Sequence, residues 1–527
     1  MNIRCSRQIV FRNITEHETL LYDRQVRLWH AGGQFRLEQA SVCVISGNAT
    51  AAEILKNLVL PDHRDVSNAD LAGNFFLEQS DICTNVAAAM CAHLRELNSD
   101  VRGRAVEERL ETLLAQTDFW LGFDVVVVCG ALSLVEQATL QSLLWPHNVA
   151  LLRVWTRGFY GAVRIARRET TVFETHDPSP TYDLRLDCPW PELVTYADLF
   201  ALEKLDDIEY AHVPYVVIYL KAIDQWRRAH RRTPPELPRT HAEKTDFRRN
   251  FVDKMARDIS HEANFAEASQ AIHRALQPTA VPESVQRLFS RKETDDALLA
   301  RSVSLFWVYV RALADFVREN GGFLPLPGVL PDMVSTTSSY VRLQRIYREK
   351  ALLDQQQFTA IVTALCERLQ LDLQPDPESI SSFCKNAAYL YVSNGAQLDT
   401  HANLAEEFAK TSGLREDPRL LLVVYFGMLA LDRWTEEGGV GGETQFLEVF
   451  CCVTGTSAHS LPKAVADTLR ELFVHNVSGY ANTCSYMGGI VAQEVLKIVT
   501  CQYIPLDNLY VFDGIWSVSD KWKACTE

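Results

Sequence analysis

The chain has 527 residues, of which 47% are hydrophobic and 23% charged, and its formal net charge is −15. At roughly 150 residues per domain this length has room for about three domains, and the composition excludes collagenous and broadly disordered proteins. Because the chain is strongly acidic, it lacks the basic footprint that binding to nucleic acid or anionic lipid normally requires. We therefore predict a globular protein that has neither of these as its main partner.

The apolar runs and the cysteines predict an intracellular protein. The longest apolar run, Leu420–Leu431, is shorter than the roughly 18 residues needed to cross a bilayer, and residues 1–13 lack the apolar core of a signal peptide. The thirteen cysteines are odd in number and include no C-x-x-C pair, which favours reduced thiols and argues against structural zinc. We expect no membrane span, no metal site and a location in the cytoplasm or the nucleus.

Apolar runs typical of buried strands alternate with stretches of helical spacing in the first third of the chain. The predicted elements are a helix at 15–39, a strand at 40–46, helices at 51–60 and 85–97, and strands at 123–129 and 149–155. This alternation predicts a doubly wound, Rossmann-like α/β fold.

Beyond Asp187 the chain is dominated by amphipathic stretches of helical length, joined by connectors rich in proline and glycine. Helices are predicted at 215–230, 305–320, 340–358 and 420–436. The last 50 or so residues return to α/β character, with a helix at 485–499 and a strand at 508–513. We therefore predict an α/β domain made of residues 10–175 and 471–527, interrupted by a large, mainly helical insertion at 176–470.

The turn after the first strand departs from a phosphate-binding loop. Such a loop reads G-x-G-x-x-G/A, because the second glycine lets the backbone approach the phosphates. Here the register Gly47-Asn48-Ala49-Thr50-Ala51-Ala52 places the methyl group of Ala49 at that position. Residues 61–70 also offer no apolar run for a second strand ending in the acidic residue that binds ribose. A relic that binds no nucleotide is favoured over a working site.

Collinear sequence blocks between Tyr22 and Asp513 resemble one family. The blocks are YDRQVRLW at 22–29, EILKNLVLP at 53–61, AGNFFL at 72–77, LNSDV at 97–101, DLRLD at 183–187, PDM at 331–333, YREK at 347–350 and GGIVAQEVLK at 488–497. They are similar to the E1 activating enzymes of ubiquitin-like proteins, and more narrowly to the regulatory subunits of heterodimeric NEDD8-activating enzymes. The resemblance implies a ThiF/MoeB-type adenylation domain, with a helical insertion in place of the catalytic-cysteine domain.

The resemblance also implies that this chain is inert by itself. In catalytic E1 subunits an arginine, a lysine and an aspartate bind the phosphates and the magnesium of ATP, and the matching positions here hold Asn74, Val86 and Leu132. These residues, with Gly47 and Ala49, form a degenerate site that cannot neutralise a triphosphate. The active-site cysteine and the paired zinc ligands also have no match. The chain is therefore expected to bind no cofactor, while a partner subunit holds ATP and magnesium.

Arg24, in the YDRQ block, is the charged site residue of the family that this chain retains. The resemblance implies an arginine finger that reaches the ATP held by the catalytic partner, and a guanidinium presents a planar fork of donors to phosphate oxygens. The alternative is an ordinary surface arginine beside an Asp23–Arg27 pair at i, i+4. The match of the whole block favours the finger.

The implied partners are a catalytic E1 subunit in a heterodimer, a NEDD8-like modifier and a cognate E2. Two alternatives stay open: the regulatory subunit of another E1, such as the SUMO enzyme, and a stand-alone nucleotide-binding α/β enzyme, such as a dehydrogenase, with its cofactor at Gly47.

The segment between Pro61 and Ala72 departs from the family pattern, because it is several residues shorter. Either the lineage has trimmed an unused site or the gene prediction is imperfect, and we expect the second strand to be missing.

Overall fold

The computed structural model describes residues 16–54, 58–97, 102–176, 182–258, 261–300, 304–371, 373, 376–412, 421–457, 461–476 and 479–525. By their contacts, residues 173–390 form one compact unit, which is helical, and residues 11–172 and 391–527 form a second, which is α/β. Residues 391–470, which the sequence analysis assigns to the insertion, thus pack within the α/β unit. The domain ranges 10–175, 176–470 and 471–527 stay a prediction.

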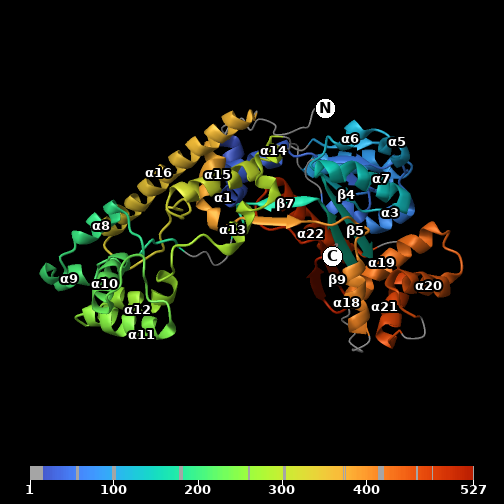
Figure 1. The fold of residues 1–527 in the computed structure, drawn as a ribbon. Helices are drawn as coiled ribbons and strands as arrows, with labels where there is room; N and C mark the ends of the chain where they lie inside the picture. Colours follow the sequence, from blue (N-terminus) through green and yellow to red (C-terminus); the bar gives the residue numbers. More distant parts are fainter. Residues whose placement is uncertain are drawn as a thin grey trace. The chain divides into compact units, whose positions relative to one another are not determined.

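The α/β unit is built on an eight-stranded sheet with the order β10-β9-β6-β5-β4-β1-β2-β3 (Figure 1). The strands are β1 Val42–Ile45, β2 Leu58–Pro61, β3 Arg104–Val106, β4 Val125–Val128, β5 Ala150–Arg157, β6 Tyr160–Ala166, β9 Leu509–Asp513 and β10 Val518–Trp522. Strands β1 to β5 are parallel and follow the doubly wound order 3-2-1-4-5, while β6, β9 and β10 are antiparallel. The predicted α/β fold is confirmed.

The sheet is covered on both faces, which explains why β1 and β4 are continuous apolar runs. Val42 and Val44 of β1 belong to one core, and Cys43 and Ile45 belong to the other. The first core is completed by α2 Ala49–Ile54, α4 Val86–Leu97 and α22 Ala481–Thr500, and the second by α5 Leu110–Leu114, α6 Thr117–Trp120 and α7 Leu134–Leu144. The sheet therefore lies between two helical layers.

The second strand is present, and the expectation that it is missing was wrong. Helix α2 ends at Ile54, and β2 pairs in parallel with β1 on one side and β3 on the other, with Leu58 opposite Val42. Leu58 and Val59 also have helical spacing after Ile54, which is why the sequence predicts a helix that continues to residue 60. A short apolar run fits a helix or a strand by spacing alone, and here two neighbouring strands decide between them.

Four further helices, α18 Ala402–Ser412, α19 Leu421–Glu436, α20 Gly442–Thr454 and α21 Lys463–Val474, share a core with β5, β6 and β9. Helix α19 is buried along most of its length, so the longest apolar run of the sequence belongs to this core. Within the described ranges, no helix is both long enough and apolar enough to cross a membrane. A small ribbon, β7 Glu169–Val172 paired with β8 Tyr391–Asn394, also belongs to this unit.

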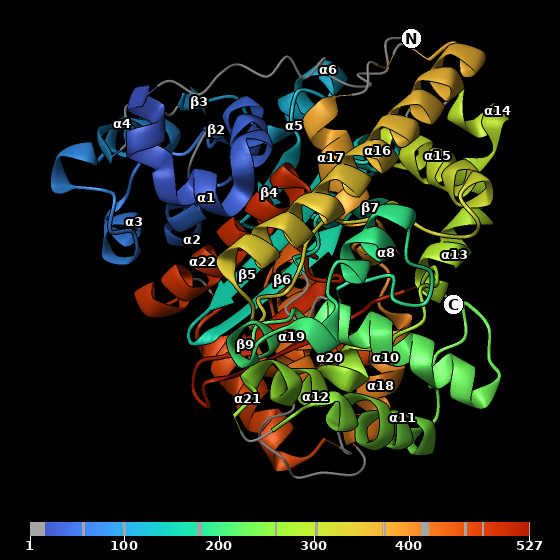
Figure 2. The ribbon, with the colours of Figure 1, turned by 90° about the vertical axis from the view of Figure 1, so that its left-hand side faces the viewer.

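The helical unit confirms the helices predicted at 215–230, 305–320 and 340–358 (Figure 2). Its longer helices are α8 Pro191–Asp198, α10 Tyr215–His230, α12 Ala263–Ala275, α15 Leu305–Glu319, α16 Thr337–Leu369 and α17 Pro377–Lys385, and its shorter ones are α9 Asp207–Tyr210, α11 His241–Phe247, α13 Glu283–Phe289 and α14 Asp296–Leu299. An aromatic cluster joins three of them, because the ring of Phe358 on α16 lies 5.9 Å from that of Tyr309 and 5.5 Å from that of Phe383.

His401, just before α18, is a source of acid sensitivity in the α/β unit. Burial and then the positive charge of Arg164 lower the pKa of His401 below its usual value, against an opposing effect of Asp399. The unfolded chain therefore binds this proton at a higher pH than the folded one, so stability is lost as the pH falls from about 6.5. We expect His401→Gln to make the loss of unfolding free energy between neutral and mildly acidic pH smaller than in the wild type.

Urea unfolding at a series of pH values, followed by tryptophan fluorescence, measures this difference. His147→Gln is the matched control, because His147 is exposed and should leave the wild-type pH dependence unchanged. Equal pH dependence in the wild type and in His401→Gln would contradict the prediction.

Candidate functional site

The loop after β1 lies at the switch point of the sheet, between β1 and β4, where doubly wound folds bind their ligands. Ser46 has a φ of +73°, while Gly47 is not among the residues with positive φ. The left-handed turn, which favours glycine, therefore falls one residue before the predicted start of the loop. It falls on a residue that carries a side chain.

Direct contacts between the loops after β1 and β4 close the switch point. Nδ2 of Asn48 donates to the carbonyl oxygen of Cys129 at 2.6 Å, and Oδ1 of Asn48 accepts from the backbone N–H of Ala51 at 3.0 Å. A Cβ atom built on Gly130 would lie only 1.9 Å from Oγ of Ser46. The loop after β1 and the loop after β4 therefore pack directly against each other at the switch point.

Asp62 follows β2 directly and is the acidic residue that the sequence analysis judged to be absent. Its carboxylate is buried, and Oδ2 accepts from the backbone N–H of Gly47 at 2.9 Å. Arg64 donates to both carboxylate oxygens, from Nη2 to Oδ2 at 2.8 Å and from Nε to Oδ1 at 3.1 Å. Hydrogen bonding to Asp62 raises the pKa of Arg64. The group that would bind ribose in a nucleotide-binding fold is therefore engaged by the protein itself.

Apolar side chains fill the space against Gly47. A Cβ atom built on Gly47 would lie 2.4 Å from Cγ1 of Val86 and 2.8 Å from Sδ of Met90, and both of these side chains are fully buried. Nδ2 of Asn74 lies 3.6 Å from the same sulfur atom, and Oδ1 of Asn74 accepts from the backbone N–H of Phe76. The structure thus brings together Gly47, Val86 and Asn74, three of the five predicted positions.

The other two positions lie apart from this cluster. Ala49 is the first residue of α2 and is half-buried. Leu132 packs with Ile45 and Val128 in the core of the opposite face of the sheet. An apolar side chain at residue 132 offers no oxygen ligand to magnesium.

These residues do not fit a nucleoside triphosphate. A phosphate group needs free backbone N–H groups and nearby cations, whereas the N–H of Gly47 is taken and Arg64 is paired. Arg153 of β5, which donates to the carbonyl oxygen of Gly130 in the loop after β4, is paired with Asp432. In the described part of the chain, no group of three His, Cys, Asp or Glu residues could hold a metal ion.

Sequence reasoning missed Asp62, Arg64 and Met90 as parts of this site. Asp62 could have been found, because it stands immediately after the apolar run that forms β2. The role of Met90 had no local signal, since it depends on how α4 packs against the loop.

Arg24 is exposed on the first half of α1 Glu16–Gln39. The Asp23–Arg27 pair expected in the alternative interpretation is present, with 3.0 Å between the carboxylate and Nε, and Arg24 takes no part in it. Arg24 has no hydrogen-bond or ion-pair partner within the described ranges. Leu28, one turn further along, is 47% exposed, so an apolar side chain accompanies the arginine on the surface.

The second half of α1 is anchored on the end of α22. Trp29 is buried, its carbonyl oxygen accepts from Nε2 of Gln502 at 2.8 Å, and its ring lies 5.6 Å from that of Tyr503. Arg36 donates to the carbonyl oxygen of Thr500 at 2.5 Å. These contacts fix the second half of α1, and Arg24 lies exposed on the first half.

The sequence profile of the ThiF family matches residues 22–523. The chain therefore belongs to the ThiF family. Curated relatives include the NEDD8-activating enzyme E1 regulatory subunits of Gallus gallus and Drosophila melanogaster, each 34% identical over 95% of this chain and 97% of the relative. The corresponding subunit of Saccharomyces cerevisiae is 27% identical over 95% of this chain and 99% of the relative. Within the ThiF family, the chain belongs with the regulatory subunits of the NEDD8-activating enzyme E1.

This membership confirms the predicted resemblance and goes against the SUMO and stand-alone alternatives. Among solved structures, Escherichia coli tRNA N6-threonylcarbamoyladenosine dehydratase is 18% identical with a TM-score of 0.24, over 28% of this chain and 64% of that chain. A likeness this slight does not bear on function.

Proposed function

We propose that this chain is the non-catalytic half of a heterodimeric E1 for a NEDD8-like modifier. The catalytic partner joins the carboxyl-terminal glycine of the modifier to AMP, releasing pyrophosphate. It then captures the modifier as a thioester on its own cysteine, with loss of AMP, for transfer to an E2. The single observation that carries the proposal is the filled switch point, in which Asp62 holds the N–H of Gly47 while Val86 and Met90 occupy the space beside it.

In this proposal Arg24 acts in trans on the ATP of the partner. Its exposure, and the absence of a partner among the residues that the structure describes, leave the guanidinium available, and the anchoring of α1 at Trp29 and Arg36 restricts where it points. A positioned guanidinium stabilises the negative charge that moves onto the phosphate oxygens during adenylation. The helical unit contributes to the binding site of the modifier or the E2. The complex acts in the cytoplasm or the nucleus.

Co-expression with a catalytic subunit and the modifier tests the proposal. We expect size exclusion to show a 1:1 complex and a thioester assay to show ATP-dependent charging of the partner's cysteine. The isolated chain should show no turnover, and ATP with magnesium should not shift its melting temperature, because only a ligand that binds the native state raises it. An isolated chain that is stabilised by ATP would contradict the assignment of an inert subunit.

A further inference from the structure

One end of the helical unit is basic although the chain as a whole is acidic. Residues 227–257 contain ten lysines and arginines but only four aspartates and glutamates. They span the end of α10, helix α11 and the π-helical turn Arg248–Val252. Six arginines of this segment are exposed. Five of them, here called the arginine surface, are Arg228, Arg231, Arg232, Arg239 and Arg249, and the sixth, Arg257, pairs with Asp207.

The end of α10 contacts α11 and the π-helical turn that follows it. Nε2 of His230, at the end of α10, lies 3.6 Å from a carboxylate oxygen of Asp246 on α11, and its ring lies 5.8 Å from that of Phe251. The pKa of Glu243 is lowered by hydrogen bonds from the backbone N–H groups of Thr240 and Arg239, and also by the charge of Arg232. The backbone N–H of Arg239 donates to a carboxylate oxygen of Glu243 at 2.9 Å, which holds Arg239 at the first turn of α11.

Part of the arginine surface has no counter-charge among the described residues. Arg228 pairs with Asp224 at 2.6 Å, and Arg232 pairs with Glu236 at 2.8 Å. Arg231, Arg239 and Arg249 have no acidic partner among the residues that the structure describes. Neighbouring like charges repel one another, so stability of the fold does not explain this arrangement.

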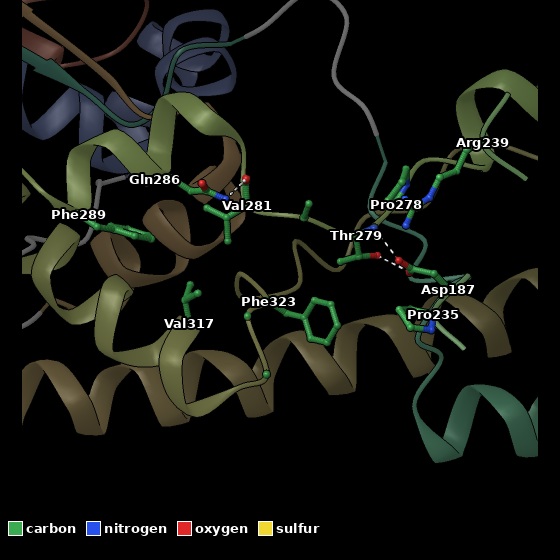
Figure 3. Close-up of a pocket in the computed structure, with 13 residues that line it drawn as sticks. Asp187, Pro235, Arg239, Pro278, Thr279, Val281, Gln286, Phe289, Val317 and Phe323 are labelled. Carbon is green, nitrogen blue, oxygen red and sulfur yellow. Dashed lines mark hydrogen bonds between the residues drawn. The ribbon is translucent and has the colours of Figure 1, made fainter. Parts of the chain in front are cut away.

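An apolar pocket of about 580 Å³ lies next to the arginine surface, and Arg239 lines it (Figure 3). Its apolar walls include Pro235, Pro278, Val281, Phe289, Val317 and Phe323. In Figure 3, Phe289 and Val317 lie at one end of the pocket, and Asp187, Pro235 and Arg239 lie at the other. A volume of this size is within the range of ligand pockets and exceeds that of a single side chain.

Hydrogen bonds inside the unit hold the walls of the pocket in place. The carboxylate of Asp187 accepts from the backbone N–H of Thr279 at 2.8 Å and from its hydroxyl at 2.6 Å, so both of its oxygens are engaged. Nε2 of Gln286 donates to the carbonyl oxygen of Val281 at 3.0 Å. The hydrogen bonds hold the Asp187 carboxylate without neutralising it, and Arg239 is the positively charged side chain among the residues that line the pocket.

We propose that the arginine surface and this pocket together bind an acidic peptide segment of a partner protein. One bulky apolar side chain of the peptide sits in the pocket, and flanking carboxylates bind Arg231, Arg239 and Arg249. Guanidinium groups match carboxylates in charge and geometry, and a buried aromatic anchor commonly dominates the affinity of such sites. A peptide is favoured over nucleic acid or a lipid surface, because the pocket accepts one bulky side chain and a few separate guanidinium groups match a few carboxylates better than a continuous row of phosphates.

Fluorescence anisotropy of the full-length chain tests this proposal. The probe is a fluorescein-labelled peptide in which a central tryptophan is flanked on both sides by glutamates. We expect Arg239→Glu to weaken binding about tenfold, and salt to weaken binding to the wild type. The matched control is Arg345→Glu on α16, which changes the net charge by the same amount at a side chain that is also exposed and should alter binding less than about twofold.

Ala280→Trp, at an exposed residue that lines the pocket, should weaken binding of the tryptophan peptide by filling the space. Equal losses in Arg239→Glu and Arg345→Glu would overturn the proposal, as would equal binding of a peptide with alanine in place of tryptophan. Tighter binding of a single-stranded oligonucleotide or of phosphatidylserine vesicles than of the peptide would also overturn it. Melting temperatures confirm that each variant is folded, and Arg249→Glu provides a second test of the arginine surface.

Discussion

Arg24→Ala should lower ATP-dependent charging of the catalytic partner on the order of 10³-fold without weakening the 1:1 complex, since arginine fingers supply effects of this size. The side chain is exposed and has no partner in the described part of the chain, and the burial of Trp29 and the Arg36 bond to α22 hold the helix independently of it. Its loss removes a positive charge from the phosphates and leaves the packing of α1 intact. Single-turnover thioester formation measures the rate, and size exclusion measures the complex.

Arg27→Ala is the matched control for this prediction. Arg27 lies on the same helix, is more than three-quarters exposed and pairs with Asp23, so its loss should change the rate less than about twofold. Arg24→Lys should recover only part of the rate, because it restores the charge without the planar fork. Charging at the wild-type rate by Arg24→Ala would remove the finger from the proposed function.

Asp432→Ala should destabilise the α/β unit by about 3–5 kcal/mol, the usual effect of removing one partner from a buried ion pair. Asp432 lies on α19 and accepts from Nη2 of Arg153 at 2.8 Å and from Nε1 of Trp155 at 2.7 Å. Arg153 is 1% exposed, and Arg157 also approaches the carboxylate at 3.7 Å. The substitution leaves two adjacent arginines without a counter-charge inside the protein. Urea unfolding gives the change in free energy.

Glu437→Ala, just after the end of α19, is the comparison for this change. It removes the exposed Arg433–Glu437 pair and should cost less than about 1 kcal/mol. Arg153 also donates to the carbonyl oxygen of Gly130, so loss of Asp432 loosens the loop after β4 at the switch point. Similar stabilities of Asp432→Ala and Glu437→Ala would show that the buried pair does not hold the unit together.

The sequence by itself determined those features that depend on neighbouring residues. The apolar runs of β1 and β4 identified buried parallel strands, and the spacing in α10 predicted both of its ends. The YDRQ block, with Arg24, and the other collinear blocks identified the family. Asn74, Val86 and Leu132 predicted a degenerate nucleotide site in it. Helical spacing, strand composition and short motifs are local properties, so they can be recognised when nothing is known of the fold.

Only the tertiary structure decided features that join distant segments. β2 became a strand because β1 and β3 flank it, although its own residues also fit a helix. The carboxylate of Asp62 reaches the N–H of Gly47 only because those strands are adjacent, and Arg153 meets Asp432 across 279 residues of sequence. A hydrogen bond or ion pair between such segments depends on where the chain returns to itself. Burial of the whole core decides which distant segments become neighbours, and no short stretch of sequence carries a pattern that shows it.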